Sequence, residues 1–249
     1  MVIKLGNKKG EITTSKIVTI ILLVLGFGIA LYFWFTVNLG NLTDEQICHN
    51  SVIQKATGQG IVGKLDCRTQ YVCISGGGEC EGINPSDTIK LDLDFSYAVA
   101  EEQIMKAVAD EMATCWWMFG EGQVSYFDFN QVGVLGQTAC AACSIVKFDE
   151  EITKRFITET SQGDFYDYLA RTPKDDTHTY FSYLYPADTP KEIKNRENHF
   201  GFDDGSYIII TGLKKPLLGG EALPLTTYFG HVDDVTSSYE CDFFVTKST

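Results

Sequence analysis

The sequence predicts an α+β fold in which an N-terminal transmembrane helix precedes an extracytoplasmic, disulfide-rich domain. Three observations support this fold class: a charge-free apolar run near the start, eight cysteines that all follow it, and helix and strand patterns without regular alternation. Such a mixture is typical of a mainly antiparallel sheet with helices packed on it. We expect four segments: a cytoplasmic basic N-terminus (1–16), the transmembrane helix (17–36), a membrane-proximal stalk and Cys-rich segment (37–86), and the α+β domain (87–249).

The apolar run at residues 17–36 reads IVTIILLVLGFGIALYFWFT and contains no charged residue. A helix of about 20 residues rises about 30 Å, the thickness of the hydrocarbon core of a bilayer. A cleavable secretory signal has a shorter apolar region and a small-residue cleavage site, whereas this run ends in YFWF. Lysines precede the run, so the N-terminus is expected in the cytoplasm and the chain from about residue 38 outside. Asn41 then begins a glycosylation sequon beyond the membrane.

The first 35 residues carry a second pattern, Lys8-Lys9-Gly10-Glu11-Ile12 followed by the apolar run. This start resembles the class III signal of archaeal type IV pilin-like proteins. The resemblance implies cleavage after Gly10 and packing of the apolar helix into a filament core. The chain also resembles single-pass, Cys-rich, membrane-anchored proteins of small-genome archaea. This second resemblance brings no known activity with it.

Charge is distributed unevenly along the chain, whose net charge is −13. Residues 1–40 hold four lysines and one acid, so the remainder holds 16 basic and 32 acidic residues. An exterior with this excess of acids repels nucleic acid and anionic lipid, and neither is an expected partner. Its acidic pairs lack the spaced oxygen ligands and turn glycine of a calcium loop, and we expect no metal and no cofactor.

All eight cysteines lie in the predicted exterior, which indicates a disulfide framework formed in an oxidising space. We expect two groups, one in the membrane-proximal segment and one in the main domain: Cys48, Cys67, Cys73 and Cys80, then Cys115, Cys140, Cys143 and Cys241. Eight cysteines allow 105 pairings, so the sequence leaves the connectivity open.

The spacing of Cys140 and Cys143 raises two alternatives, a thiol-redox motif and a zinc site. Redox chemistry needs the first thiolate at a helix N-terminus, and the stretch SIVKFDEE that follows alternates like a strand. Zinc needs two further ligands, and the chain has no second CxxC.

Several elements are expected from local patterns. Helical periodicity and cap residues predict helices in four stretches: 44–56, 98–120, 161–173 and 177–188. Alternating or continuous apolar residues predict seven strands: 66–75, 88–95, 124–129, 143–149, 206–213, 225–232 and 241–247. Residues 188–206 are polar and predict a loop, and Gly76-Gly77-Gly78 predicts a turn.

The stretch ATCWWMFGEG (113–122) combines a cysteine, two tryptophans and a glycine-rich end. Cys115 and Trp116 lie about 100° apart on a helical wheel, so both can face one core, and Gly120 suits the C-terminal cap. We favour a helix end packed on a sheet. The alternatives are an exposed binding patch of Trp116 and Trp117, and catalysis by Cys115 or Glu121, for which no histidine lies nearby in sequence.

No catalytic constellation stands out, so we expect a non-enzymatic, membrane-anchored domain with a structural or interaction role at the cell surface. Its expected contacts are the membrane, through residues 17–36, and a protein partner or a second copy of the chain. The alternatives are a pilin-like filament subunit and a thiol-redox enzyme using Cys140 and Cys143.

Overall fold

The computed structural model describes most of the chain: residues 14–39, 42–58, 65–94, 96–128, 136–156, 162–186, 202, 204–217, 220–234 and 240–247. Side chains are not described at 14–16, 33–39 and 162–163. The chain divides into two compact units, Met1–Thr43 and Asp44–Thr249. Residues 44–86, which the sequence assigned to a separate stalk segment, therefore belong to the same unit as the main domain.

The first unit contains helix α1 (Thr14–Leu39). Every large apolar side chain from Ile17 to Tyr32 is exposed, by 40% to 68%. Among the residues that the structure describes, no helix has the length and apolar character needed to cross a membrane. The described side chains of the predicted span end at Tyr32, and Gly10 and Asn41 lie outside the described residues.

The second unit contains the helices and strands given below, besides a short helical segment at 232–234. The helices are α2 (Asp44–Ala56), α3 (Tyr97–Met118), α4 (Glu150–Arg155), α5 (Gln162–Arg171) and α6 (Tyr180–Leu184). The strands are β1 (Gln70–Ser75), β2 (Asp87–Lys90), β3 (Thr138–Phe148), β4 (Tyr207–Lys214), β5 (Leu223–His231) and β6 (Phe243–Phe244). The predicted α+β class is confirmed.

The six strands form one sheet in the order β2-β1-β3-β4-β5, with β6 beside the start of β3. Strands β3, β4 and β5 pair antiparallel, whereas β1 pairs parallel with β2 and β3, and β6 pairs parallel with β3. The sheet is therefore mixed: its longest pairings, β3 with β4 and β4 with β5, are antiparallel as expected, and the shorter pairings of β1 and β6 are parallel. Among the described strands only β4 and β5 follow each other as a hairpin, and the crossover from β1 to its parallel neighbour β3 contains β2 and helix α3.

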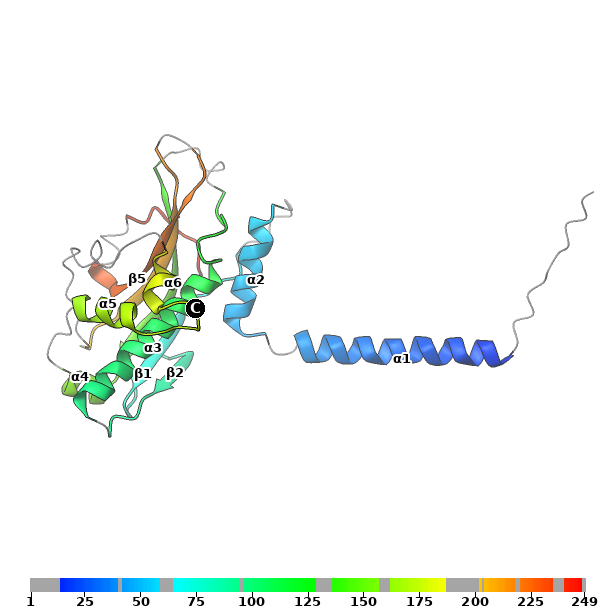
Figure 1. The fold of residues 1–249 in the computed structure, drawn as a ribbon, viewed down its shortest axis with the longest axis horizontal. Helices are drawn as coiled ribbons and strands as arrows, with labels where there is room; N and C mark the ends of the chain where they lie inside the picture. The colour runs from blue at the N-terminus through cyan, green and yellow to red at the C-terminus, as the bar shows by residue number, and fades with distance from the viewer. Residues whose placement is uncertain are drawn as a thin grey trace, which may run out of the picture. The chain divides into compact units, whose positions relative to one another are not determined.

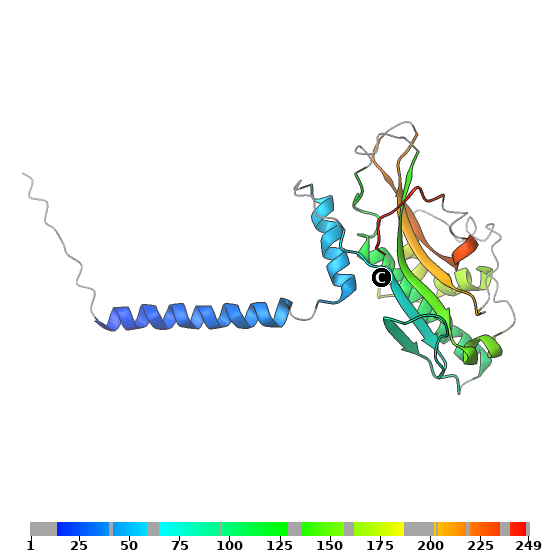
Figure 2. The same cartoon turned by 180° about the vertical axis from the view of Figure 1, so that it is seen from behind.

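Helices α3, α5 and α6 cover one face of the sheet (Figure 1), and the opposite face is seen from behind (Figure 2). The main core lies between these layers and includes Ile104, Met112, Val146, Leu169 and Ile209, all at most 1% exposed. A smaller cluster on the other face contains Cys140, Ile208, Ile210 and Tyr228.

The long helix was predicted almost to its ends. Its C-terminus is a Schellman motif: the Gly120 N–H donates to the Trp117 carbonyl oxygen and the Glu121 N–H donates to the Trp116 carbonyl oxygen, both at 3.0 Å. Gly120 has φ +77°, so it occupies the left-handed position that follows the cap, as the sequence indicated.

Several predicted strands differ from the structure: β1 begins at Gln70 rather than at 66, and β3 begins at Thr138 rather than at 143. The strand expected at 88–95 spans only Asp87–Lys90, and the one at 241–247 only Phe243–Phe244. The strand expected at 124–129 is wrong, since the described residues 124–128 form no strand and Tyr126 packs its ring on Phe119 instead. Most of the expected loop 188–206 lies outside the described residues.

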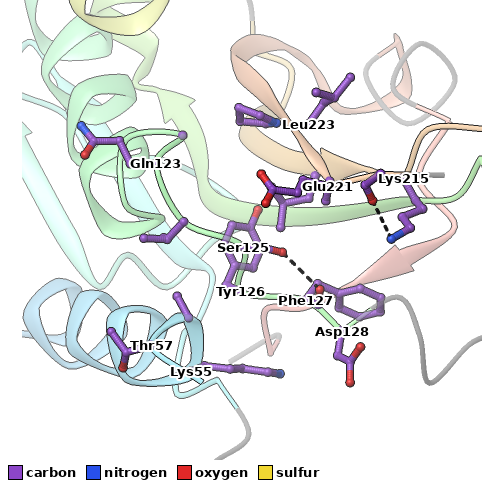
Figure 3. A pocket seen from close by; sticks show the side chains of 17 residues that line it. Lys55, Thr57, Gln123, Ser125, Tyr126, Phe127, Asp128, Lys215, Glu221 and Leu223 are labelled. Carbon is purple, nitrogen blue, oxygen red and sulfur yellow. Dashed lines mark hydrogen bonds between the residues drawn. The ribbon is translucent and has the colours of Figure 1, made fainter. Parts of the chain in front are cut away.

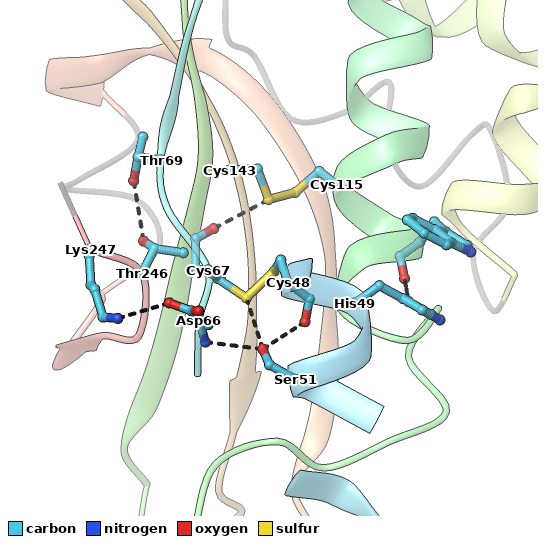
Figure 4. Close-up of a disulfide and its surroundings, with 12 residues drawn as sticks. Cys48, His49, Ser51, Asp66, Cys67, Thr69, Cys115, Cys143, Thr246 and Lys247 are labelled. Atoms are coloured by element: carbon cyan, nitrogen blue, oxygen red, sulfur yellow. Dashed lines mark hydrogen bonds and ion pairs between the residues drawn. A yellow bond between two sulfur atoms is a disulfide. The ribbon is translucent and has the colours of Figure 1, made fainter. Parts of the chain in front are cut away.

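All eight cysteines are paired: Cys48–Cys67, Cys73–Cys80, Cys115–Cys143 and Cys140–Cys241. Each pair falls within one of the two groups expected from the sequence. The first pair fixes α2 to the chain before β1 (Figure 4). Asp66 reinforces this junction. Its N–H donates to Ser51 Oγ at 3.1 Å, and its carboxylate accepts from Lys247 Nζ at 3.1 Å.

Candidate functional site

The second unit carries a cleft of about 770 Å³ beside the end of α2 (Figure 3). The cleft is lined by residues 55–57 at the end of α2, by residues 122–128 of the loop after α3, and by residues 213, 215 and 220–224 of the β4–β5 hairpin. Tyr126 and Leu213 are buried at its base, and Val124, Phe127 and Ala222 are partly buried against the core. Ligand sites are typically concave, partly apolar and about 300–1,000 Å³ in volume, so this cleft has the size of a binding site.

The glycines of the ATCWWMFGEG stretch shape one wall of this cleft. Gly120, Glu121 and Gly122 all have positive φ, between 56° and 77°, and turn the chain sharply after α3. A side chain at Gly122 would place its Cβ 2.8 Å from the Trp116 ring and 3.2 Å from Pro224. Glycine at this position therefore allows the β4–β5 hairpin to approach the end of α3.

The rim of the cleft carries both signs of charge. Lys55 and Asp128 project from one side, and Lys215 and Glu221 from the hairpin (Figure 3). Lys215 Nζ donates to the Gly220 carbonyl oxygen at 2.9 Å, which holds the lysine along the hairpin. Of the described residues that line the cleft, none is histidine or cysteine, so the lining offers groups for binding and no evident nucleophile–base pair.

Two exposed leucines lie on the hairpin that borders the cleft. Leu217 is 74% exposed and Leu223 is 58% exposed. Large apolar side chains that form a contiguous exposed patch mark sites of protein contact, so the two leucines are candidate contact residues.

The structure separates the two tryptophans. Trp116 is buried at 4% exposure, which agrees with the favoured core interpretation. Trp117 is partly buried and stacks on His49 of α2, with ring centroids 4.1 Å apart and an interplanar angle of 8°. His49 Nδ1 lies 2.7 Å from the Trp117 carbonyl oxygen, so this nitrogen carries the proton and donates. The pair anchors α2 on α3, and the burial of Trp116 does not fit the alternative of an exposed patch of Trp116 and Trp117.

The structure does not bring Cys140 and Cys143 together as a redox pair. Cys143 is bonded to Cys115 of α3, whereas Cys140 is bonded to Cys241 on the opposite face of the sheet. Both lie inside β3 and are fully buried, and all eight thiols are consumed in disulfides. Within the described residues, no group of histidine, cysteine and acidic side chains could hold a metal ion.

One buried acid was missed by the sequence reasoning. Asp149 is 1% exposed, and its Oδ2 accepts from Ser75 Oγ (2.9 Å), the Gly76 N–H (2.9 Å) and the Gly78 N–H (2.7 Å). Its Oδ1 accepts from the Ile152 N–H at 3.0 Å, which caps α4. The run Asp149-Glu150-Glu151 carries an N-cap signal that predicts the cap, whereas nothing local predicts the bond to the glycine turn.

A second missed acid, Glu111 of α3, accepts from Ser144 Oγ at 3.1 Å. Burial raises the pKa of Glu111 to about 7, and the nearby carboxylates Asp87, Glu45 and Asp110 add to the rise. Two tyrosines also titrate far from their usual range: burial and the carboxylates of Asp110 and Glu121 raise the pKa of Tyr180 and Tyr183. These hydroxyls stay protonated and donate, as at the 2.7 Å bond from Tyr183 to Glu121.

Comparison with known proteins returned no family model, no curated protein and no solved structure that matches this chain.

Proposed function

We propose that this protein is a membrane-anchored, extracytoplasmic domain that binds a protein partner and has no catalytic role. The observation that carries the proposal is the contrast between the two units. α1 exposes apolar side chains throughout its described length, whereas the second unit has a closed core in which all eight cysteines are paired.

The anchor is supported by the chemistry of α1. A helix that is apolar all round needs an apolar environment, either lipid or other protein. The charge-free run of the sequence continues to residue 36, four residues past the described side chains, and reaches the length that a bilayer requires. The disulfides support an extracytoplasmic location, because the cytosol keeps such thiols reduced.

The interaction role is supported by the cleft and its hairpin. The cleft joins an apolar base to a rim of mixed charge, and the neighbouring leucines are exposed. A protein segment with an apolar side chain and flanking charges of both signs fits this chemistry, whereas the acidic exterior disfavours nucleic acid.

Membrane extraction of the full-length chain tests the anchor. Val24→Lys together with Ile29→Lys places two charges in the middle of α1, at about 2.5–3.5 kcal/mol each for insertion. We expect the unmodified chain to stay in the membrane fraction after alkaline carbonate treatment and the double variant to be released. Asn84→Lys with Thr88→Lys, at two exposed positions of the second unit, is the matched control and should stay in the membrane. Release of the unmodified chain would contradict the proposal.

The pilin-like filament subunit is the second candidate, because a long apolar helix also suits a filament core. The intact mass of the chain from its own membranes separates the two. A mass that begins at Met1 or Val2 supports the anchor, and a mass that begins at Glu11 supports the pilin-like subunit. Alkylation under denaturing, non-reducing conditions should add nothing to either mass.

A further inference from the structure

A group of carboxylates gathers where α2, α3 and the sheet meet. Gln70 of β1 and Ser144 of β3 are partners in the parallel register, so they lie side by side on adjacent strands. Gln70 Nε2 donates to Glu45 Oε1 of α2 at 2.7 Å, and Ser144 Oγ donates to Glu111 Oε2 of α3 at 3.1 Å. Two neighbouring sheet residues thus hold one acid from each helix.

Ser144 reaches Glu111 because of an irregularity in β3. The pairing with β4 shifts between Ala142 and Ser144, so Cys143 is an extra residue in the strand. Cys143 is bonded to α3 through Cys115, and Ser144 faces α3 as well. Ser144 is only 3% exposed, so its hydroxyl binds the carboxyl group of Glu111 against the buried sheet.

The described charges that act on Glu111 are all acidic. The charged groups that act on it are Asp87 from β2, Glu45 from α2 and Asp110 from α3 itself. From β3 it binds the neutral hydroxyl of Ser144, whose partner in β1, Gln70, binds Glu45. Two bases on the helices are paired with other acids: Lys106 with Asp110 at 2.6 Å, and Arg171 of α5 with Glu102 at 3.2 Å. From α6, the Tyr180 hydroxyl donates to Asp110.

We propose that Glu111 is a pH-sensitive latch that seats the first turns of α2 on the sheet when it is neutral and loosens them when it ionises. Ionised Glu111 repels Glu45, whose bond to Gln70 joins the first turn of α2 to the sheet. The Cys48–Cys67 disulfide and the His49–Trp117 stack keep α2 attached, so the opening is local. The latch is closed in acidic surroundings and loosens as the pH rises to neutrality.

The sign follows from proton binding. The seated state binds the Glu111 proton up to about pH 7, whereas an opened state, with the carboxyl in water, releases it near pH 4.5. Seating is therefore strongest below about pH 4.5 and weakens until about pH 7. From pH 5.5 to pH 8 these values give an opening equilibrium that rises about 30-fold at most.

Hydrogen exchange of the full-length chain in neutral detergent tests the latch. Protection factors of amides in residues 44–56, corrected for the intrinsic pH dependence of exchange, should fall roughly 10- to 30-fold from pH 5.5 to pH 8. Amides of β4 serve as the internal reference and should change less than about threefold. Glu111→Gln replaces the carboxyl group with an uncharged amide of the same size, so protection of α2 should stay high at pH 8. Glu79→Gln, at an exposed position, is the control and should behave like the unmodified chain.

Two further variants keep the test decisive if Glu111→Gln fails to fold. Ser144→Ala removes a donor that favours the charged carboxylate, so the transition should move to higher pH. Glu45→Gln removes a like charge, so it should move to lower pH. An equal loss of protection in α2 and β4, or a Glu111→Gln variant that opens like the unmodified chain, would overturn the proposal.

Discussion

Replacing Asp149 tests how much of the stability of the second unit depends on one buried carboxylate. Asp149→Ala removes the acceptor for the Ser75 hydroxyl and for the N–H groups of Gly76, Gly78 and Ile152. Loss of the cap on α4 costs about 1 kcal/mol. Each hydrogen bond to a charged group contributes about 1.5–3 kcal/mol, but the two glycine donors are only partly buried and regain water. We therefore expect a loss of about 4 kcal/mol.

Urea unfolding of the full-length chain, with its disulfides intact, measures this loss. In a domain of this size 1 kcal/mol corresponds to about 2–4 °C, so the melting temperature should also fall by roughly 10 °C. Asp149→Asn keeps one oxygen for the Ile152 N–H and sets an amide against the three donors at the glycine turn. It should therefore be less stable than the unmodified protein by about 2–3 kcal/mol.

Asp204→Ala, at an exposed aspartate, is the control and should change stability by less than about 0.5 kcal/mol. A loss below about 1 kcal/mol for Asp149→Ala, or an Asp149→Asn variant as stable as the unmodified chain, would refute the reasoning. The carboxylate would then be incidental to the fold of the glycine turn.

Two other predictions concern the end of α3, and both are read from urea unfolding. Trp116→Ala should destabilise by about 3–5 kcal/mol because the ring is buried. Trp117→Ala should destabilise by about 1–2 kcal/mol because its ring is only partly buried and loses mainly the His49 stack. The reverse order would contradict the assignment of Trp116 to the core. Gly120→Ala should cost about 2–4 kcal/mol, since φ is +77° and the new Cβ would lie 2.2 Å from Val124 Cγ2. Gly58→Ala is the control, because Gly58 has φ +70° and open space around it. It isolates the cost of the left-handed backbone and should destabilise by about 1 kcal/mol. Equal losses at the two glycines would show that contact with Val124 is unimportant.

Local patterns predicted the elements whose stability depends on nearby residues. The helix at 44–56, the long α3 and its glycine cap, and the strands β4 and β5 follow from periodicity, capping and apolar runs. The parallel pairings of β1 could not be predicted in this way, because strand direction depends on how the chain crosses over between strands. The alternating segment 124–129 failed for a related reason: Tyr126 packs on Phe119, a contact that only the turn at Gly120–Gly122 makes available.

The candidate site was less predictable than the fold. Its walls come from the end of α2, the loop after α3 and a hairpin about 100 residues further along, so no short stretch carries its signature. The bond between Asp149 and the Gly76–Gly78 turn likewise joins residues more than 70 positions apart. Sequence reasoning identified the glycine turn and left its partner unknown.

The pair Cys140 and Cys143 shows why a spacing has no fixed chemical meaning. In a helix, residues three apart share a face and can act together, whereas in a strand they lie on opposite faces. Because residues 138–148 form a strand, the two sulfurs bind different layers: Cys143 holds α3 and Cys140 holds the C-terminal segment. The extra residue at Cys143 then lets Ser144 face α3 as well, beside the disulfide. One irregular strand thus positions both a covalent link between layers and the hydroxyl that binds Glu111, so a motif that resembled redox chemistry serves the packing of the layers instead.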